Sequence, residues 1–176
     1  YTPEHKAETR ARLVEHARRL FRENGFEAVS IDTLMAAAGL TRGGFYAHFA
    51  SKGALVAEVL QIEPGLIGAI RATPAAGAAL DQVAAYLDPE ARAQLQQCAF
   101  VAHASEVARG TPEERALFAA QVSALVEQLD RFGRGAVLAA LTVGAAVLAN
   151  AVDDADDALA RRLAADALAF VRDELG

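Results

Sequence analysis

The sequence predicts an all-α fold of about nine helices. Three observations support this prediction: apolar residues recur at the spacing of one helix face, helix-capping residues stand between the apolar segments, and strand-like alternation is absent. With 176 residues, of which 53% are hydrophobic, the chain is long enough to bury a large helical core. Its single cysteine excludes an intramolecular disulfide framework.

The first helix is predicted from an apolar face near the N-terminus, and the Asn24-Gly25 pair supplies its left-handed stop. This face comprises Leu13, Val14, Ala17, Leu20 and Phe21. A second, shorter helix is expected to begin after a Ser30 cap and to close at Gly39. Its inward face comprises Ile31, Leu34 and either Ala37 or Ala38.

The third helix is short and is predicted to begin after a Thr41 cap. Phe45 and Phe49 lie four residues apart, so they give this helix an apolar side that faces the first two helices. Its other side is suited to close approach and hydrogen bonding, and it carries Arg42, Gly43, Tyr46 and His48. Ser51 is expected to cap a fourth helix with Lys52 at its start.

These elements closely resemble the DNA-binding domain of the TetR family of transcriptional repressors. The resemblance rests on the phrase Gly-Phe-Tyr-x-His-Phe-x-Ser-Lys at 44–52, just after a Gly-Leu-Thr turn at 39–41. It covers about the first 55 residues, and beyond Leu60 it concerns the order of helices only. It implies a helix-turn-helix domain at 1–52, whose last helix enters the DNA major groove, and a helical ligand-binding and dimerisation domain at 53–176.

The resemblance also implies roles for single residues. Thr41, Tyr46 and His48 would bond phosphate oxygens, and Lys52 would clamp the backbone. Arg42 would face base edges, because its guanidinium can read guanine with two hydrogen bonds. The candidate DNA-binding residues are Ser30, Thr41, Arg42, Gly43, Gly44, Tyr46, His48 and Lys52. Gly44 departs from the family pattern, which more often has a small side chain there.

Three of these contacts have structural alternatives. Tyr46 could be a half-buried core aromatic with its hydroxyl in water. His48 could be only a solvent-facing helix residue. Arg42 could form a surface ion pair with an acid such as Asp32.

Charge is divided unevenly along the chain. Residues 1–52 hold eight Lys or Arg against six Asp or Glu, a net charge of +2, whereas the whole chain carries −6 and the remainder therefore −8. A mildly basic head can approach phosphate while an acidic body stays away from it. Two heads presented together would double the phosphate contacts, and their affinity for DNA would fall steeply with salt.

Further helices are expected near 53–71, 76–87, 90–109, 112–131, 136–152 and 154–175. Thr111-Pro112-Glu113-Glu114 is a capping box with proline at the first helical position. Asp88-Pro89-Glu90 is a similar start, and Asp153-Asp154 lies ahead of the last helix. Pro64-Gly65 interrupts a helix that usually runs unbroken in the family, and the connector at 132–135 is abrupt, so a kink and absent loop residues both remain open.

Residues 135–152 carry no charge, which meets the lower limit for a membrane span. We interpret them as a soluble helix buried on all sides, because alanine and glycine drive membrane insertion only weakly. The family supplies that burial, since its last two helices form a four-helix bundle with those of a second subunit. The candidate interface comprises Ala140, Gly144, Val147, Leu148, Leu159, Leu163 and Phe170, on faces that also include Ala167 and Val171. An intramolecular core helix is the alternative.

In the family, the middle helices enclose a small-molecule pocket whose occupancy lowers the affinity for DNA. The candidate lining residues are mainly apolar with a few polar groups, as in most ligand sites, and each could instead belong to the core. They are Tyr86, Cys98, Phe100, His103, Phe118 and Gln121. Cys98 would sense electrophiles or oxidants if partly exposed, whereas its apolar neighbours favour a buried thiol.

The sequence therefore predicts a homodimeric, sequence-specific DNA-binding regulator, a repressor that an unknown small molecule releases from a near-palindromic operator. It contains no glycine-rich phosphate loop, metal-spaced His/Cys pair or nucleophile beside a base, so no enzyme, metal site or cofactor is predicted. A thiol-sensing repressor and a helical module that binds small molecules without DNA are the alternatives. The first twenty residues are charged throughout, so a cytoplasmic protein without a secretory signal is expected.

Overall fold

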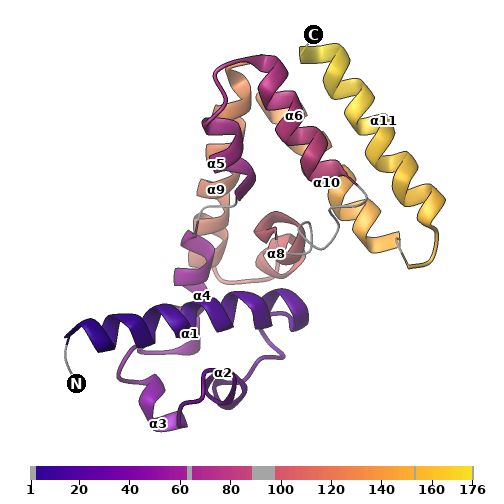
Figure 1. Cartoon of the computed structure of the whole chain (residues 1–176). Coiled ribbons are helices and arrows are strands. Elements are labelled where there is room, and N and C mark those ends of the chain that lie inside the picture. The colour runs from indigo at the N-terminus through magenta and orange to yellow at the C-terminus, as the bar shows by residue number, and fades with distance from the viewer. Residues whose placement is uncertain (1–2, 63–64, 89–97, 153, 176) are drawn as a thin grey trace. The chain divides into compact units, whose positions relative to one another are not determined.

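The computed structural model describes residues 3–62, 65–88, 98–152 and 154–175 (Figure 1). These residues form ten helices and no strand, which confirms the all-α prediction. The chain divides into two compact units: a head unit of residues 1–62 and 102–118, and a body unit of residues 63–101 and 119–176. This division follows contacts and not function, so the domain boundary expected after residue 52 stays a prediction.

The head unit contains α1 (Pro3–Asn24), α2 (Ile31–Ala37), α3 (Arg42–Phe45) and α4 (Lys52–Gln61). It also includes most of α8 (Ala99–Val107) and the start of α9 (Pro112–Asp130). All five predicted apolar residues of α1 are buried, together with side chains from the other three N-terminal helices. The core therefore lies inside the helix-turn-helix motif and against α1, and its largest fully buried members include Phe21, Phe45, Leu13, Leu34, Met35 and Leu55.

Two predicted side-chain caps and two predicted glycine stops of the head are confirmed. Ser30 Oγ accepts the N–H of Thr33 at 3.0 Å, and Ser51 Oγ accepts the N–H of Ala54 at 3.1 Å. Gly25 and Gly39 have φ angles of +83° and +68°, in the left-handed region where a side chain is strained. Local sequence therefore ends α1 and α2 where the pattern indicates.

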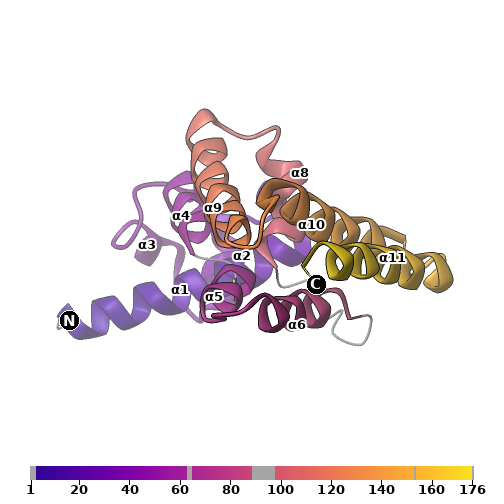
Figure 2. The same cartoon turned by 90° about the horizontal axis from the view of Figure 1, so that it is seen from above.

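The body unit contains α5 (Gly65–Arg71), α6 (Ala76–Leu87), α10 (Gly135–Val152) and α11 (Asp157–Leu175). Helices α10 and α11 lie side by side, and α6 packs against both (Figures 1 and 2). Small residues line the buried side of α11, where they let the helices approach closely: Ala160, Ala164, Ala167 and Val171.

Several predicted boundaries need correction. The single helix expected at 53–71 is two helices, α4 and α5, and Pro64 lies outside the described residues. The last helix begins at Asp157 and not near 154, because Asp156 Oδ1 accepts the N–H of Leu159 at 3.0 Å as its cap. Of the helix expected at 90–109, residues 90–97 lie outside the described residues and α8 ends at Val107. The starts proposed at Pro89-Glu90 and Asp153 also lie outside them.

Hydrogen bonds explain the predicted signals at the two ends of α9. In the capping box, Thr111 N–H donates to Glu114 Oε2 at 2.7 Å, and Glu114 N–H donates to Thr111 Oγ1 at 3.2 Å. The abrupt connector at 132–135 is a tight turn in which Gly135 N–H donates to Asp130 Oδ1 at 2.8 Å. A Cβ at Gly135 would come within 2.4 Å of the Val126 carbonyl oxygen, so this turn requires glycine.

Two glycines of the helix-turn-helix offer a matched test of stability. At both Gly39 and Gly43, no described atom lies within 4 Å of where a Cβ would stand. Gly39→Ala should lower the free energy of unfolding by about 1–2 kcal/mol, because φ is +68° there. Gly43→Ala should raise it by up to about 1 kcal/mol, because alanine is the better helix former. Urea denaturation measures both, and effects of equal sign would contradict the backbone assignment.

Candidate nucleic-acid interface

Two buried aromatic side chains hold α3 in place, Phe45 in the helix and Phe49 beyond its end, so the helix is shorter than the predicted segment. Phe45 is fully buried and Phe49 is 3% exposed, and their ring centroids lie 5.6 Å apart. The guanidinium carbon of Arg10 lies 4.1 Å from the centroid of the Phe49 ring, and its Nη atoms bond the His48 carbonyl oxygen and Glu58. The predicted inner side of this short helix is therefore confirmed, and its orientation is set by α1 and α4.

The opposite side of α3 faces solvent. Thr41, Arg42, Gly43 and Tyr46 are exposed, and 58% of Tyr46 is accessible while its ring edge contacts Phe45. Tyr46 is thus outside the core, contrary to the core-aromatic alternative. Four neighbouring positions consequently present a hydroxyl, a guanidinium, bare backbone and a phenol on one surface.

Thr41 stands at the N-cap position of α3, with φ −89° and ψ 150°, but it caps through its backbone only. Its carbonyl oxygen accepts the N–H of Gly44 at 2.9 Å, whereas its hydroxyl makes no capping hydrogen bond within residues 3–62. The expectation of a side-chain cap is wrong here. The hydroxyl is left to an external partner, for which a phosphate oxygen is suitable.

Ser30 and Lys52 flank this surface in different ways. The Ser30 hydroxyl is used inside α2, since it also lies 2.8 Å from the Thr33 hydroxyl. Lys52 Nζ donates to the Glu27 carbonyl oxygen at 3.3 Å, which uses only one of its three N–H donors. Lys52 therefore keeps a charge and two donors for phosphate.

His48 is half-buried. Its Nδ1 atom is buried and has no hydrogen-bond partner among the described residues. Burial, and then the positive charges of Lys6 and Arg10, lower the pKa of the imidazole below its usual 6.5. A neutral imidazole at pH 7 can hydrogen-bond a phosphate oxygen but adds no charge to that contact.

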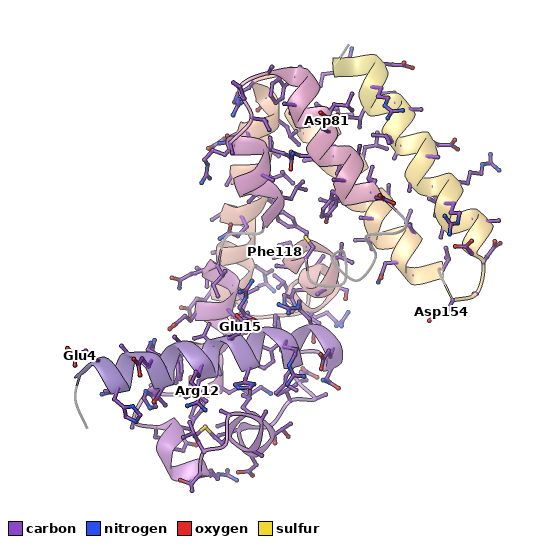
Figure 3. All side chains as sticks on the ribbon, viewed as in Figure 1. Glu4, Arg12, Glu15, Asp81, Phe118 and Asp154 are labelled. Carbon is purple, nitrogen blue, oxygen red and sulfur yellow. The ribbon has the colours of Figure 1, made fainter. Side chains whose placement is uncertain are left out.

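Arg42 forms the surface ion pair named as an alternative in the sequence. Its Nη1 lies 2.7 Å from Asp32 Oδ2, and the two side chains are 64% and 59% exposed. A second arginine, Arg12, has a structural role: its Nη2 donates to the Ala38 carbonyl oxygen at 2.8 Å from the side of α1 that faces α2 (Figure 3). In the head, Arg12 therefore supports the fold, whereas Arg42 lies at the surface.

A carboxylate from far along the chain completes the turn after α1. Glu106 on α8 accepts the N–H of Phe26 at 2.7 Å, 80 residues away in sequence. Gly25 has a φ of +83°, which strains any side chain, and a Cβ there would also come within 2.5 Å of Glu106 Oε1 and displace the carboxylate. No local pattern marks Glu106, and sequence reasoning missed it.

The candidate ligand residues do not all belong to the same unit: Tyr86, Cys98, Phe100 and Gln121 lie in the body unit, and His103 and Phe118 lie in the head unit. The Tyr86 hydroxyl lies 3.1 Å from Cys98 Sγ. Cys98 is partly exposed, so the buried thiol favoured by its apolar sequence neighbours is wrong. Burial, and then the neighbouring Cys98, raise the pKa of Tyr86, so it stays protonated and donates. The assignment of these six residues to a ligand site stays a prediction.

His103 lies in the head core. It is 1% exposed and stacks on Phe26 with ring centroids 4.6 Å apart. Its Nδ1 lies 3.7 Å from Glu106 Oε2, and neither atom has a hydrogen-bond partner in the described part of the chain. Burial, and then the positive charge of Arg22, lower the pKa of His103 to about 4.

In the body unit, α10 and α11 border an open groove of about 690 Å³. Six of the seven candidate interface residues line it: Ala140, Gly144, Leu148, Leu159, Leu163 and Phe170. Leu148, Leu159 and Phe170 are 54%, 41% and 44% exposed, an unusual state for large apolar side chains. Val171, expected on the same face, instead packs inward at 1% exposure, whereas Ala167 lines the groove although it is only 4% exposed.

Helix α10 is not buried on all sides within one chain. Gly135–Val152 has a mean hydropathy of 2.0, and only 39% of it is buried. By length and composition it passes the test for a membrane span, which core helices of soluble proteins also pass. Its exposed apolar side coincides with the groove.

Comparison with known proteins places the N-terminal segment in a family. Residues 13–59 match the family described as "Bacterial regulatory proteins, tetR family". The HTH-type transcriptional regulator AcrR of Shigella flexneri is 36% identical over 67 residues, which are 38% of this chain and 31% of AcrR. The aligned segment thus spans about a third of the length of that relative.

Solved structures extend the likeness of fold to the whole chain. The reduced form of NemR from E. coli has a TM-score of 0.74 at 20% identity, covering 94% of this chain and 96% of that one. FadR from Bacillus subtilis, in complex with stearoyl-CoA, has a TM-score of 0.60 at 13% identity, covering 94% and 99%. Identities this low show a shared fold only.

The buried His103 predicts a loss of stability in mild acid. Its pKa is about 4 in the folded protein against the usual 6.5, so the unfolded chain binds the proton first as the pH falls. Above pH 6.5, titration of His103 costs the folded protein no stability. As the pH falls from 6.5 to 4, the free energy of unfolding decreases by up to about 3 kcal/mol.

Denaturation at about pH 7.5 and about pH 4.5 measures this loss. His103→Phe retains the ring stack without a titrating nitrogen, so it should show a smaller loss than the wild type. His5→Phe, at an exposed histidine, is the control and should behave as the wild type does. Parallel losses in all three proteins would show that His103 does not titrate in this range.

Proposed function

We propose that this chain, whose residues 13–59 match the tetR family of bacterial regulatory proteins, is a dimeric, sequence-specific DNA-binding transcriptional regulator. We further propose that it represses transcription from a near-palindromic operator in the cytoplasm and that a small molecule releases it. The family agrees with the expectation of a regulator and not an enzyme.

The observation that carries this proposal is the exposed side of α3. Buried Phe45 and Phe49 fix the helix. The exposed side chains of Thr41, Arg42 and Tyr46 are therefore not needed for the core and can face a groove of the DNA. The open backbone at Gly43 permits close approach to a base pair. This arrangement suits a recognition helix in the major groove.

The contacts divide by chemistry. Thr41, Tyr46, His48 and Lys52 offer hydroxyl, imidazole and ammonium donors for phosphate, which set the register on DNA without carrying sequence information. Arg42 offers the planar group that reads guanine. With a net charge of only +2 over residues 1–52, one head would bind weakly, so affinity depends on presenting two heads.

The groove between α10 and α11 supports the dimer. Leu148, Leu159 and Phe170 are exposed on neighbouring helices and line the groove. If the same two helices of a second copy cover this groove, the interface uses the same surface on both subunits. Four helices packed in this way would bury the uncharged side of α10. Two-fold symmetry of the protein then requires a near-palindromic site.

The effector is proposed to bind in the body. Complex formation between a neighbour of the same fold, FadR, and stearoyl-CoA supports a small-molecule effector, without indicating its chemistry here. A second candidate is a thiol-sensing repressor, which is favoured by the partly exposed Cys98 beside the Tyr86 hydroxyl. Release of operator by a thiol-alkylating reagent, abolished in Cys98→Ser, would distinguish the two.

DNA binding is tested by selecting bound fragments from a random duplex pool at about 100–150 mM salt. We expect a near-palindromic site. Tyr46→Phe and Lys52→Ala should weaken binding to all sequences alike, by about threefold to tenfold. Arg42→Ala should also relax preference at one base position in each half-site, by about 1–3 kcal/mol.

Arg19→Ala is the matched control for Arg42→Ala, since it also removes an exposed arginine from a surface ion pair of the head. It should leave base preference unchanged. Recovery of asymmetric single sites would overturn the two-fold arrangement, and an equal loss at every sequence for Arg42→Ala would reduce that residue to a phosphate contact.

The dimer is tested by placing charge in the groove. Leu148→Asp and Phe170→Asp should yield monomers in analytical ultracentrifugation, because an unpaired carboxylate cannot be buried in an apolar interface. Operator affinity should fall about 100-fold, since the second head no longer binds intramolecularly. Val122→Asp, at an exposed valine of α9 outside the groove lining, should remain dimeric. Dimers in both groove variants would exclude this interface.

A further inference from the structure

We propose that Asp32 is a specificity-determining residue, whose carboxylate holds the Arg42 guanidinium in position to read a base. Sequence reasoning treated an Arg42–Asp32 pair as an alternative to base recognition. The geometry points instead to a pair that serves it. This inference rests on the proposed function, because it concerns how the same surface discriminates between DNA sequences.

The pair bridges the two helices of the motif. Asp32 lies in the first turn of α2 and Arg42 is the first residue of α3, and their side chains meet at 2.7 Å. Both helices are anchored close to the pair: the Ser30 cap fixes the start of α2, and α2 packs against α3, with Met35 and Phe45 both buried in the head core. The carboxylate is therefore presented from a rigid element.

Stability does not explain the pair. Both side chains are more than half exposed, and exposed ion pairs contribute little to folding because water and salt screen them. Affinity for phosphate does not explain it either, since a carboxylate beside the recognition helix repels the DNA backbone. An acid in the first turn of α2 favours that helix through its dipole, but this effect needs no arginine partner. The pair itself can therefore act in discrimination between sequences.

The chemistry of the two groups supplies that discrimination. A guanidinium carries five N–H donors, and the bond to Asp32 uses one at Nη1, which leaves donors for guanine N7 and O6. The carboxylate also offsets the charge of Arg42, so that the side chain is less attracted to the nearest phosphate. Gly43 and Gly44 follow Arg42 without side chains, so they cannot restrict its rotamer. Asp32 is the contact that does so.

The test compares the wild type with Asp32→Asn, which keeps the shape and removes the charge, in the same random-duplex selection. We expect preference at the base position read by Arg42 to fall about threefold or more, while affinity for non-specific DNA rises. If the released Arg42 moves to a phosphate, the slope of log K against log salt concentration should steepen by about 0.9 per head.

A double mutant separates positioning from an indirect effect on charge. In an Arg42→Ala background, Asp32→Asn should leave base preference unchanged, because there is no guanidinium to hold. Glu23→Gln is the matched control, since it removes one negative charge from another exposed ion pair of the head, with Arg19 at 3.2 Å. It should not alter preference at any position. Circular dichroism checks that each variant is folded.

The outcomes distinguish the two proposals. Unchanged preference in Asp32→Asn, with a wild type that selects a defined site, would overturn this inference and leave the proposed function in place. The same would follow if Asp32→Asn altered preference equally with and without Arg42, since Asp32 would then act independently. A folded, dimeric wild type that selects no duplex would overturn both.

Discussion

The burial of Phe45 and Phe49 is the constraint on which the DNA-binding surface depends. Helix α3 has only four residues, Arg42–Phe45, and two of them are glycine, so it could not hold its shape alone. Burial of the two rings in the head core supplies the order that helix propensity does not. The exposed side of α3 is consequently fixed in direction although its own residues make few contacts, which is the property a recognition surface requires.

Charged side chains of the head perform two separate tasks. Arg10 and Arg12 bond backbone oxygens and a carboxylate within the unit, and thereby join α1 to the segments on either side of α3. Arg42 and Lys52 remain at the surface. With a net charge of only +2 over residues 1–52, the head can bind DNA only if each remaining donor is well placed. The positions of the donors therefore matter more for DNA binding than charge density.

The body solves a different packing problem with few bulky side chains. Alanines and Val171 form the inner side of α11, and the larger Leu159 and Phe170 are left outside, next to Leu148 of α10. Helix α10 is apolar over eighteen residues and only 39% buried, so a monomer would expose an apolar surface to water. Dimerisation would remove that surface and at the same time set the spacing of the two heads.

Local sequence determined where helices begin and end: the Ser30 and Ser51 caps, the Thr111–Glu114 box, the left-handed glycines and the spacing of the buried phenylalanines were all predictable, because each depends on residues within one or two turns. It also identified the residues of the α3 surface. The tertiary structure alone decided that Glu106 holds the turn at Phe26, that His103 is stacked in the head core, and that Val171 turns inward from the groove. Each of these features depends on contacts between residues that are distant in the chain. The periodicity of one helix does not specify which distant side chain packs against that helix.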